Sequence, residues 1–244
     1  MFPIGDENAG TVIKPYVNWT IFGICVVVFI YELLLPPRQL ETLFFQFGAI
    51  PAEISRFSDL YALITSMFLH GGWAHIIGNM LFLLVFGDNI EDAMGHLSYL
   101  LFYLLTGIAA GLAQVLLDVN STIPLIGASG AISGVLGAYI VLFPHGKVRA
   151  VVVFGFLQVI MVPAWIMIGL WFVLQLISGI ASLGAAPGGG VAFWAHVGGF
   201  VAGALLVWIF RDKDAVARQN AVRGTHQAWQ RVPAGAQGGR RGPF

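Results

Sequence analysis

Six long apolar stretches are the feature that most constrains how this chain of 244 residues can fold. A helix needs roughly 20 residues to cross the hydrocarbon core of a bilayer. The stretches are close to that length and occupy residues 17–35, 64–86, 97–117, 128–144, 163–181 and 192–210. Only 10% of the residues are charged, whereas soluble domains average about 25%. The sequence therefore predicts an all-α membrane protein with six transmembrane helices and excludes an ordinary soluble domain.

The apolar stretches divide the chain into three parts. Residues 1–16 form an N-terminal segment, 17–210 form the six-span domain, and 211–244 form a tail rich in Ala, Gly, Gln and Arg. The tail lacks apolar periodicity, and we expect it to be disordered. Within the domain, residues 36–63 combine charges with an aromatic cluster. This composition favours an amphipathic structure in the headgroup zone over a disordered linker.

The distribution of basic residues predicts how the helices cross the membrane. Cytoplasmic loops collect Lys and Arg, and six spans put ten of the 12 basic residues on the side of both termini, leaving Arg38 and Arg56 on the other. We therefore expect both termini in the cytoplasm, with the tail contacting anionic lipid. A seventh span over 150–162 would move the tail outside, so we predict a short interfacial or re-entrant segment there. The sequence also predicts an acidic turn at Gly87–Gly95.

Charge and cysteine usage exclude further classes. The 12 basic and 12 acidic residues balance to a formal net charge of +0, so no overall field attracts nucleic acid. Cys25 is the single cysteine, and it cannot form a disulfide within the chain. The first apolar stretch lacks a small-residue cleavage motif, so we expect a retained span rather than a signal peptide.

Three of the predicted helices carry polar residues in their first turns. The second, fourth and sixth spans run in the same direction, so these turns lie at one depth. His75 and Asn79 are four residues apart and share a helix face. Ser129 opens the fourth span, and His196 lies near the start of the sixth. Ionisable groups inside a membrane are costly and indicate function, so we expect these residues to form one site.

The chemistry expected of this site is acyl transfer. Serine is a weak nucleophile that needs a neighbouring base, most often histidine, so Ser129 and His196 are the candidate nucleophile and base. The N–H of Ser129 begins a helix and is free to bind an oxyanion, with His75 and Asn79 as further donors. Small residues allow the close approach of helices that such a site requires. They are Gly127, Gly130, Gly134 and Gly137 on the fourth span, and Gly199 and Gly203 on the sixth.

These motifs resemble those of the rhomboid family of intramembrane serine proteases. The matching residues are His75-x-x-x-Asn79, Gly127-Ala128-Ser129-Gly130, Ala195-His196-x-x-Gly199-x-x-x-Gly203, His70, Phe86-Gly87-Asp88-Asn89-x-Glu91 and Pro163-Ala164-Trp165. The resemblance covers roughly residues 17–210 and is to bacterial members, which implies a location in the bacterial cytoplasmic (inner) membrane. It implies a hydrolase with a Ser–His dyad, no third carboxylate and no cofactor. It also implies a membrane-embedded first loop, and single-pass membrane proteins as substrates that are cleaved near the outer membrane face.

Some residues have roles that the resemblance does not predict. Certain members carry an aromatic residue one turn after the serine, stacked on the catalytic histidine, and this chain has Ser133 there. The residue that holds His196 is therefore not predicted. We expect His70 to bond loop backbone rather than to act in catalysis. Gln175 lies in an apolar stretch, and we expect a backbone carbonyl to satisfy its amide.

Three other functions compete with the protease. Metal binding by His70, His75 and His196 is disfavoured because the sequence has no H-E-x-x-H motif and no carboxylate near them in the spans. A non-catalytic rhomboid-like protein that binds or chaperones membrane proteins has no reason to keep both Ser129 and His196. A transporter often shows internal repeats around a midplane site, and this sequence shows none. The sequence makes no prediction of the oligomeric state.

Overall fold

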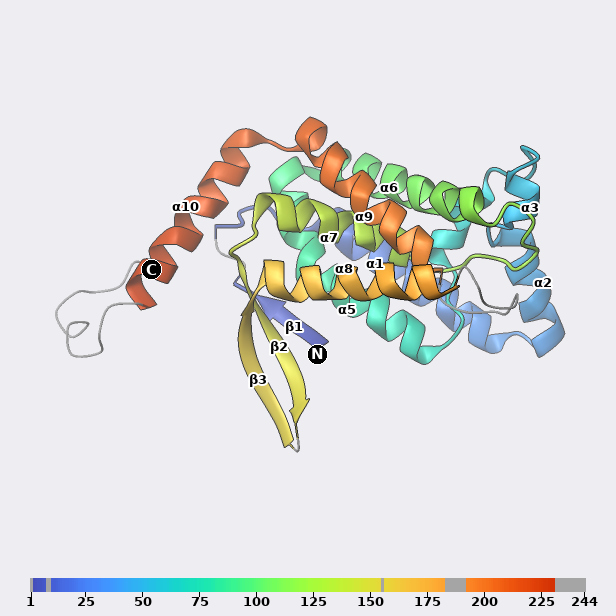
Figure 1. Ribbon diagram of the computed structural model, residues 1–244, viewed down its shortest axis with the longest axis horizontal. Helices are drawn as coiled ribbons and strands as arrows, with labels where there is room; N and C mark the ends of the chain where they lie inside the picture. Colours follow the sequence, from blue (N-terminus) through green and yellow to red (C-terminus); the bar gives the residue numbers. More distant parts are fainter. Residues whose placement is uncertain (1, 8–9, 155, 183–191, 231–244) are drawn as a thin grey trace.

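Six helices form the body of the molecule. The computed structural model describes residues 2–7, 10–154, 156–182 and 192–230. The bundle helices are α1 (Tyr16–Leu34), α5 (Trp73–Met94), α6 (His96–Leu117), α7 (Ser129–Leu142), α8 (Ala164–Ser182) and α9 (Phe193–Phe210), which run roughly along one axis (Figure 1). All of them except α7, a 14-residue apolar helix, are long and apolar enough to cross a membrane. The predicted class, a helical membrane protein, is confirmed.

The central helix is α7, which packs against α5, α6 and α9. Ten of its 14 residues are buried, as expected for a helix that is apolar on all sides. Its contact with α9 is close because glycines occupy the positions at which the two backbones approach each other. A Cβ atom on Gly199 would clash with the carbonyl oxygen of Gly130, and one on Gly203 with that of Gly134. The predicted close packing of these glycine faces is confirmed.

Short helices connect α1 to α5. They are α2 (Pro37–Phe47), α3 (Pro51–Ile54), α4 (Ala62–Thr65) and the 3-10 helix η1 (Ser66–Phe68). The amphipathic structure predicted in residues 36–63 is confirmed by α2, which has apolar and polar residues on opposite faces. The predicted start of the second span at residue 64 is wrong. The Gly71–Gly72 pair interrupts the helical pattern, and α5 begins at Trp73.

The predicted acidic turn at Gly87–Gly95 is also wrong, because α5 continues to Met94. The Glu91 carboxylate is not exposed in a loop but binds the start of another helix. The Glu91 carboxylate accepts the N–H groups of Val17 and Asn18, at 3.0 and 2.7 Å. Those N–H groups have no partner within α1, so the acidic residues satisfy a buried helix end and leave α5 unbroken.

A β-hairpin occupies the segment predicted to be interfacial or re-entrant. Strand β2 (Lys147–Phe154) pairs antiparallel with β3 (Phe156–Pro163), and β1 (Phe2–Asp6) joins β2 on its other side. Figure 1 shows the hairpin projecting sideways from the bundle near the start of α8. The β-branched residues of β2 favour strand structure, but its partner β1 lies at the N-terminal end of the chain, far from β2 in sequence.

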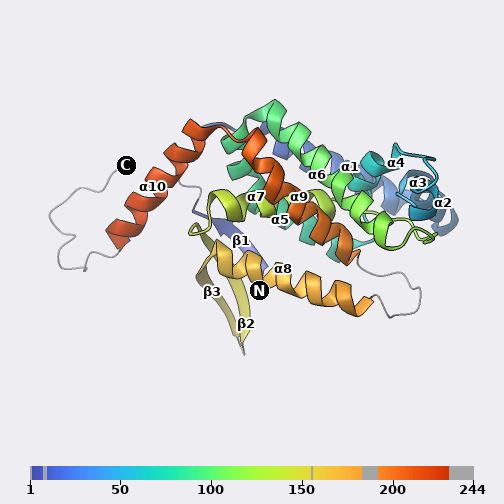
Figure 2. The same cartoon turned by 45° about the horizontal axis from the view of Figure 1, so that its top comes forward.

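The tail also has structure that its composition did not predict. Residues 213–230 form helix α10 (Lys213–Gln230), beyond the end of α9 (Figure 2). Gln219 and Arg218 each donate to the Asp92 carboxylate on α5, at 2.7 Å. The predicted disorder is therefore wrong for α10, because its polar residues bind buried acceptors. Residues 231–244 lie outside the described residues.

Candidate active site

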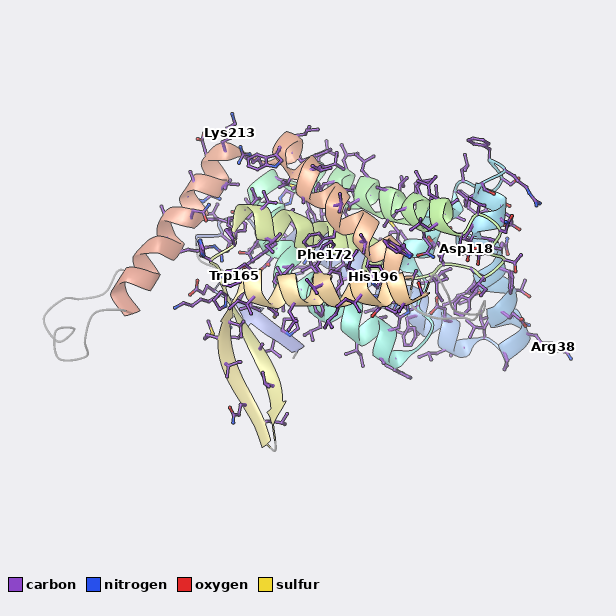
Figure 3. All side chains as sticks on the ribbon, in the orientation of Figure 1. Arg38, Asp118, Trp165, Phe172, His196 and Lys213 are labelled. Atoms are coloured by element: carbon purple, nitrogen blue, oxygen red, sulfur yellow. The ribbon has the colours of Figure 1, made fainter. Side chains whose placement is uncertain are left out.

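The first turns of α5, α7 and α9 surround one cavity. Its volume is about 880 Å³, and it is lined by all four of the polar residues that the sequence predicts to meet, His75, Asn79, Ser129 and His196. Trp171 of α8 lines it as well. Figure 3 shows His196 toward the end of the molecule that carries Asp118, with Lys213 at the opposite end. The cavity therefore lies toward one end of the bundle.

Ser129 and His196 are in direct contact within this cavity. The Oγ atom of Ser129 lies 2.8 Å from Nε2 of His196. Ser129 is the first residue of α7, and His196 lies in the first turn of α9 with 8% of its surface exposed. A hydroxyl within hydrogen-bond distance of an imidazole is the geometry of a nucleophile and its base.

Two residues of α8 hold the His196 ring. Oε1 of Gln175 lies 2.8 Å from Nδ1 of His196. The Trp171 ring lies beside the imidazole, with centroids 5.9 Å apart and an interplanar angle of 36°. Ser133 does not take part, because its hydroxyl donates to the carbonyl of Ser129 at 2.6 Å. The amide oxygen of Gln175 thus has a side-chain partner that the sequence did not predict.

The roles of Trp171 and Gln175 were not predicted from the sequence, although a signal for them exists. The two residues are four positions apart on α8, so they share one helix face. A polar side chain beside a tryptophan on one stripe of an otherwise apolar helix indicates a polar partner within the bundle. Nothing in the spacing identifies that partner as His196.

His75 and Asn79 present hydrogen-bond donors to the same cavity. Nδ1 of His75 accepts the N–H of Gly71 at 3.3 Å, so the neutral ring carries its proton on Nε2. Asn79 is buried, and its Nδ2 has no hydrogen-bond partner among the described residues. An unpaired buried donor costs about 1–3 kcal/mol. Such a group beside a serine and a histidine is suited to bind an acceptor that arrives with a ligand.

Glycines bring these donors close to Ser129. Gly127 has a φ of +122°, a value that L side chains rarely adopt, and a Cβ atom there would lie 2.6 Å from Nε2 of His75. A Cβ atom on Gly130 would lie 2.6 Å from that of Ala110 on α6. The predicted supporting glycines therefore occupy positions at which the backbone passes close to its neighbours.

His70 lies in the loop before α5, beside the cavity but not lining it. Its Nδ1 is 3.2 Å from the carbonyl oxygen of Phe68, and its ring centroid is 5.3 Å from that of His75. Its backbone N–H donates to the carboxylate of Glu32, at 3.1 and 3.3 Å. Burial lowers the pKa of His70 to about 4, with a smaller contribution from His75. These contacts fit the expected role of bonding loop backbone, and Glu32 is a partner that the sequence did not predict.

Comparisons with known proteins identify relatives of most of the bundle. Residues 58–213 match the family model of the Rhomboid domain, which is more than half of the chain. Over 205 residues the chain is 28% identical to the rhomboid protease AarA of Providencia stuartii, covering 74% of this chain and 67% of that protein. It is 34% identical over 126 residues to the rhomboid protease GluP of Bacillus subtilis, covering 51% of this chain and 24% of that protein.

A plant protein is also similar. The chain is 28% identical over 171 residues to Rhomboid-like protein 11, chloroplastic, of Arabidopsis thaliana, covering 68% of this chain and 58% of that protein. A yeast relative, the mitochondrial Rhomboid protein 1 of Saccharomyces cerevisiae, is 30% identical over 167 residues, or 66% of this chain and 45% of that protein. The chain thus spans about half the length of these two relatives.

Proposed function

This chain belongs to the rhomboid family, and from that premise we propose that it is an intramembrane serine endopeptidase with Ser129 as nucleophile and His196 as general base. The family, with its bacterial proteases, supports a membrane-embedded protease. The observation that carries the assignment of residues is the 2.8 Å contact between Ser129 Oγ and His196 Nε2.

The proposed reaction begins when Ser129 Oγ attacks the carbonyl carbon of the scissile bond. His196 Nε2 accepts the serine proton and then donates it to the departing amine. The carbonyl oxygen becomes an oxyanion, to which the Ser129 N–H, His75 Nε2–H and Asn79 Nδ2–H donate. Water, deprotonated by His196, then hydrolyses the acyl-serine and restores both side chains.

We propose that the substrates are single-pass membrane proteins cleaved near one membrane surface. The position of the cavity toward one end of the bundle supports a cut near the surface rather than at the midplane. A peptide bond within a helix is protected by its own backbone hydrogen bonds. Substrates with Gly, Pro or small residues near the cut should therefore be preferred, because these residues loosen the helix.

The proposed orientation puts the cavity at the outer face of a bacterial cytoplasmic membrane and both termini in the cytoplasm. The basic residues support it, since Lys147, Arg149 and Lys213 follow the ends of α7 and α9 that lie away from the cavity. Cysteine labelling tests it. Reagents applied from outside should label Asp118→Cys, which lies near the cavity end, and should not label Lys213→Cys. The opposite pattern would reverse the orientation.

Proteolysis of a single-pass test substrate by the purified protein in detergent tests the function. Ser129→Ala and His196→Ala should each abolish cleavage, and the double variant should be no worse, because the two residues act as a unit. Ser133→Ala is the matched control, since it removes a neighbouring hydroxyl that binds only backbone. A fluorophosphonate should label the wild type and not Ser129→Ala.

The alternative is a non-catalytic rhomboid-like protein that binds or chaperones membrane proteins. Binding needs neither the Ser129 hydroxyl nor the His196 base. Substrate capture by a folded wild type without any cleavage or labelling would therefore favour the alternative and contradict the protease.

A further inference from the structure

The two ring nitrogens of His196 each have one side-chain partner. Nε2 contacts Ser129 Oγ and Nδ1 contacts Gln175 Oε1, both at 2.8 Å. The ring is buried, so water does not readily replace either partner. What faces Nδ1 therefore decides which nitrogen carries the proton.

A neutral imidazole has one N–H donor and one nitrogen that accepts. An amide oxygen only accepts, so Oε1 of Gln175 pairs with a protonated Nδ1. Nε2 then has a free lone pair directed at the Ser129 hydroxyl, as a general base requires. In the other tautomer, the Nδ1 lone pair would face the Oε1 lone pairs, and Nε2 would donate its proton to Ser129 instead of accepting one.

We propose that Gln175 is a positioning residue that holds His196 in its base-competent tautomer. This inference rests on the proposed function for the role of His196 as base, but the tautomer itself is a property that can be measured without activity. Gln175 touches no reacting atom, so it acts through His196 alone.

The same task is performed in other serine hydrolases by a buried carboxylate. Within the described residues, the side chains that hydrogen-bond to the His196 ring are those of Gln175 and Ser129, and neither carries a charge. A carboxylate in an apolar helix would carry a large desolvation cost, whereas a neutral amide orients the ring without it. The expected loss on removing Gln175 is consequently smaller than the loss on removing a triad carboxylate.

Packing keeps Gln175 in register with His196. The Phe172 ring of α8 stacks on Phe200 of α9, with centroids 4.3 Å apart and an interplanar angle of 26°. Trp171 contacts both Phe200 and His196. Figure 3 shows α8 and α9 side by side where Phe172 and His196 are labelled. The aromatic contacts thus hold α8 against α9 one turn away from the hydrogen bond between Gln175 and His196.

The experiment compares three variants in the full-length protein. Gln175→Leu removes the acceptor, Gln175→Glu keeps an accepting oxygen, and Gln114→Leu is the control. Gln114 also contacts α9, but it accepts the backbone N–H of Ala195 at 3.3 Å and does not touch the ring. A correctly placed general base raises the rate about 10²–10⁴-fold. If only part of the His196 population keeps the base-competent tautomer, kcat should fall roughly 10- to 100-fold.

We expect Gln175→Leu to lower kcat and the rate of fluorophosphonate labelling by the same factor, with KM within about twofold. Gln175→Glu should recover most of that loss, and Gln114→Leu should remain near wild type. Wild-type kcat in Gln175→Leu would overturn the proposal. So would an equal loss in Gln114→Leu, or a Gln175→Glu variant as slow as Gln175→Leu.

Nitrogen NMR of histidine-labelled protein reports which ring nitrogen of His196 carries the proton. If Gln175 had only a structural role, this tautomer would not change in its variants. With the His196 signals assigned by their absence in His196→Ala, the wild type should show a protonated Nδ1 and an unprotonated Nε2. Gln175→Leu should show a mixture, and an unchanged tautomer would overturn the proposal even if activity falls. Because this signal does not depend on turnover, it separates failure of the proposal from failure of the protease assignment.

Discussion

The contact between α7 and α9 sets the distance between Ser129 and His196, and Gly203→Ala tests this. Gly203 lies seven residues after His196, two turns along the same face of α9. A Cβ atom there would overlap with the carbonyl oxygen of Gly134. That oxygen belongs to the backbone and cannot rotate away. The helices must separate by about 1 Å to relieve the clash, because a packed interior has no free volume to absorb it.

That displacement is large compared with the range of distances over which a hydrogen bond forms. A shift of about 1 Å would move Ser129 and His196 from 2.8 Å apart to the edge of hydrogen-bond range or beyond it. Misplacement of a reacting group by about 1 Å costs about 10²-fold in rate, and overpacking costs about 1–3 kcal/mol of stability. We therefore expect Gly203→Ala to lower kcat about 100-fold while the protein still folds.

The assay is cleavage of a fixed substrate in detergent, with thermal unfolding measured in parallel. Gly23→Ala on α1 is the matched control, because a Cβ atom there meets no atom within 4 Å. Both variants gain the same helix propensity, so their difference isolates the clash. Equal kcat in the two variants would refute the argument that this close approach sets the distance between the two residues.

Three further predictions follow from the donors, the loop and the tail. Asn79→Ala removes one of three proposed oxyanion donors and should lower kcat up to about 10²-fold with little change in KM; wild-type kcat would remove Asn79 from the site. Between its ordinary pKa of about 6.5 and the folded value of about 4, His70 binds a proton only in the unfolded chain, so stability should fall as pH falls through this range. His70→Gln should reduce the drop in melting temperature between about pH 7 and about pH 5, and an unchanged drop would assign it to other groups. Asp92→Ala removes the acceptor of Arg218 and Gln219, so trypsin should cut α10 at Arg218 faster than in wild type, and equal rates would show that Asp92 does not dock α10.

Hydropathy predicted the bundle well where helices are bounded by polar loops. The predicted spans 17–35, 97–117 and 192–210 each begin and end within a residue or so of α1, α6 and α9. The same signal failed at α5, because the hydropathy of residues 64–72 does not distinguish a membrane span from the short turns that precede Trp73. Hydropathy records how apolar a segment is, and helix ends also depend on backbone breaks such as Gly71–Gly72.

The candidate site was more predictable than the elements that support it. The four polar residues predicted to meet lie within the first two turns of their helices, where a polar residue stands out against an apolar stretch. By contrast, β1 pairs with β2 across most of the chain length, from Phe2 to Val151, and no local pattern encodes such a partner. Gln175 was missed for a related reason, since an amide that orients a histidine and one that bonds a carbonyl have the same sequence signature.

A buried amide at the Ser129 end of the bundle favours a binding role for that end. At the far end, Arg223 donates to Asn89 and Gln219 donates to Asp92, so tail and bundle groups bind one another, although Nε of Arg223 has no partner among the described residues. At the Ser129 end, the Asn79 amide is buried without a partner in the described part of the chain. A folded protein loses stability by keeping such a donor, and Asn79, unlike Arg223, lines the cavity in which a ligand can complete the bond. We therefore expect the Asn79 amide to bind an acceptor that is present only when substrate is bound, which is what a developing oxyanion supplies.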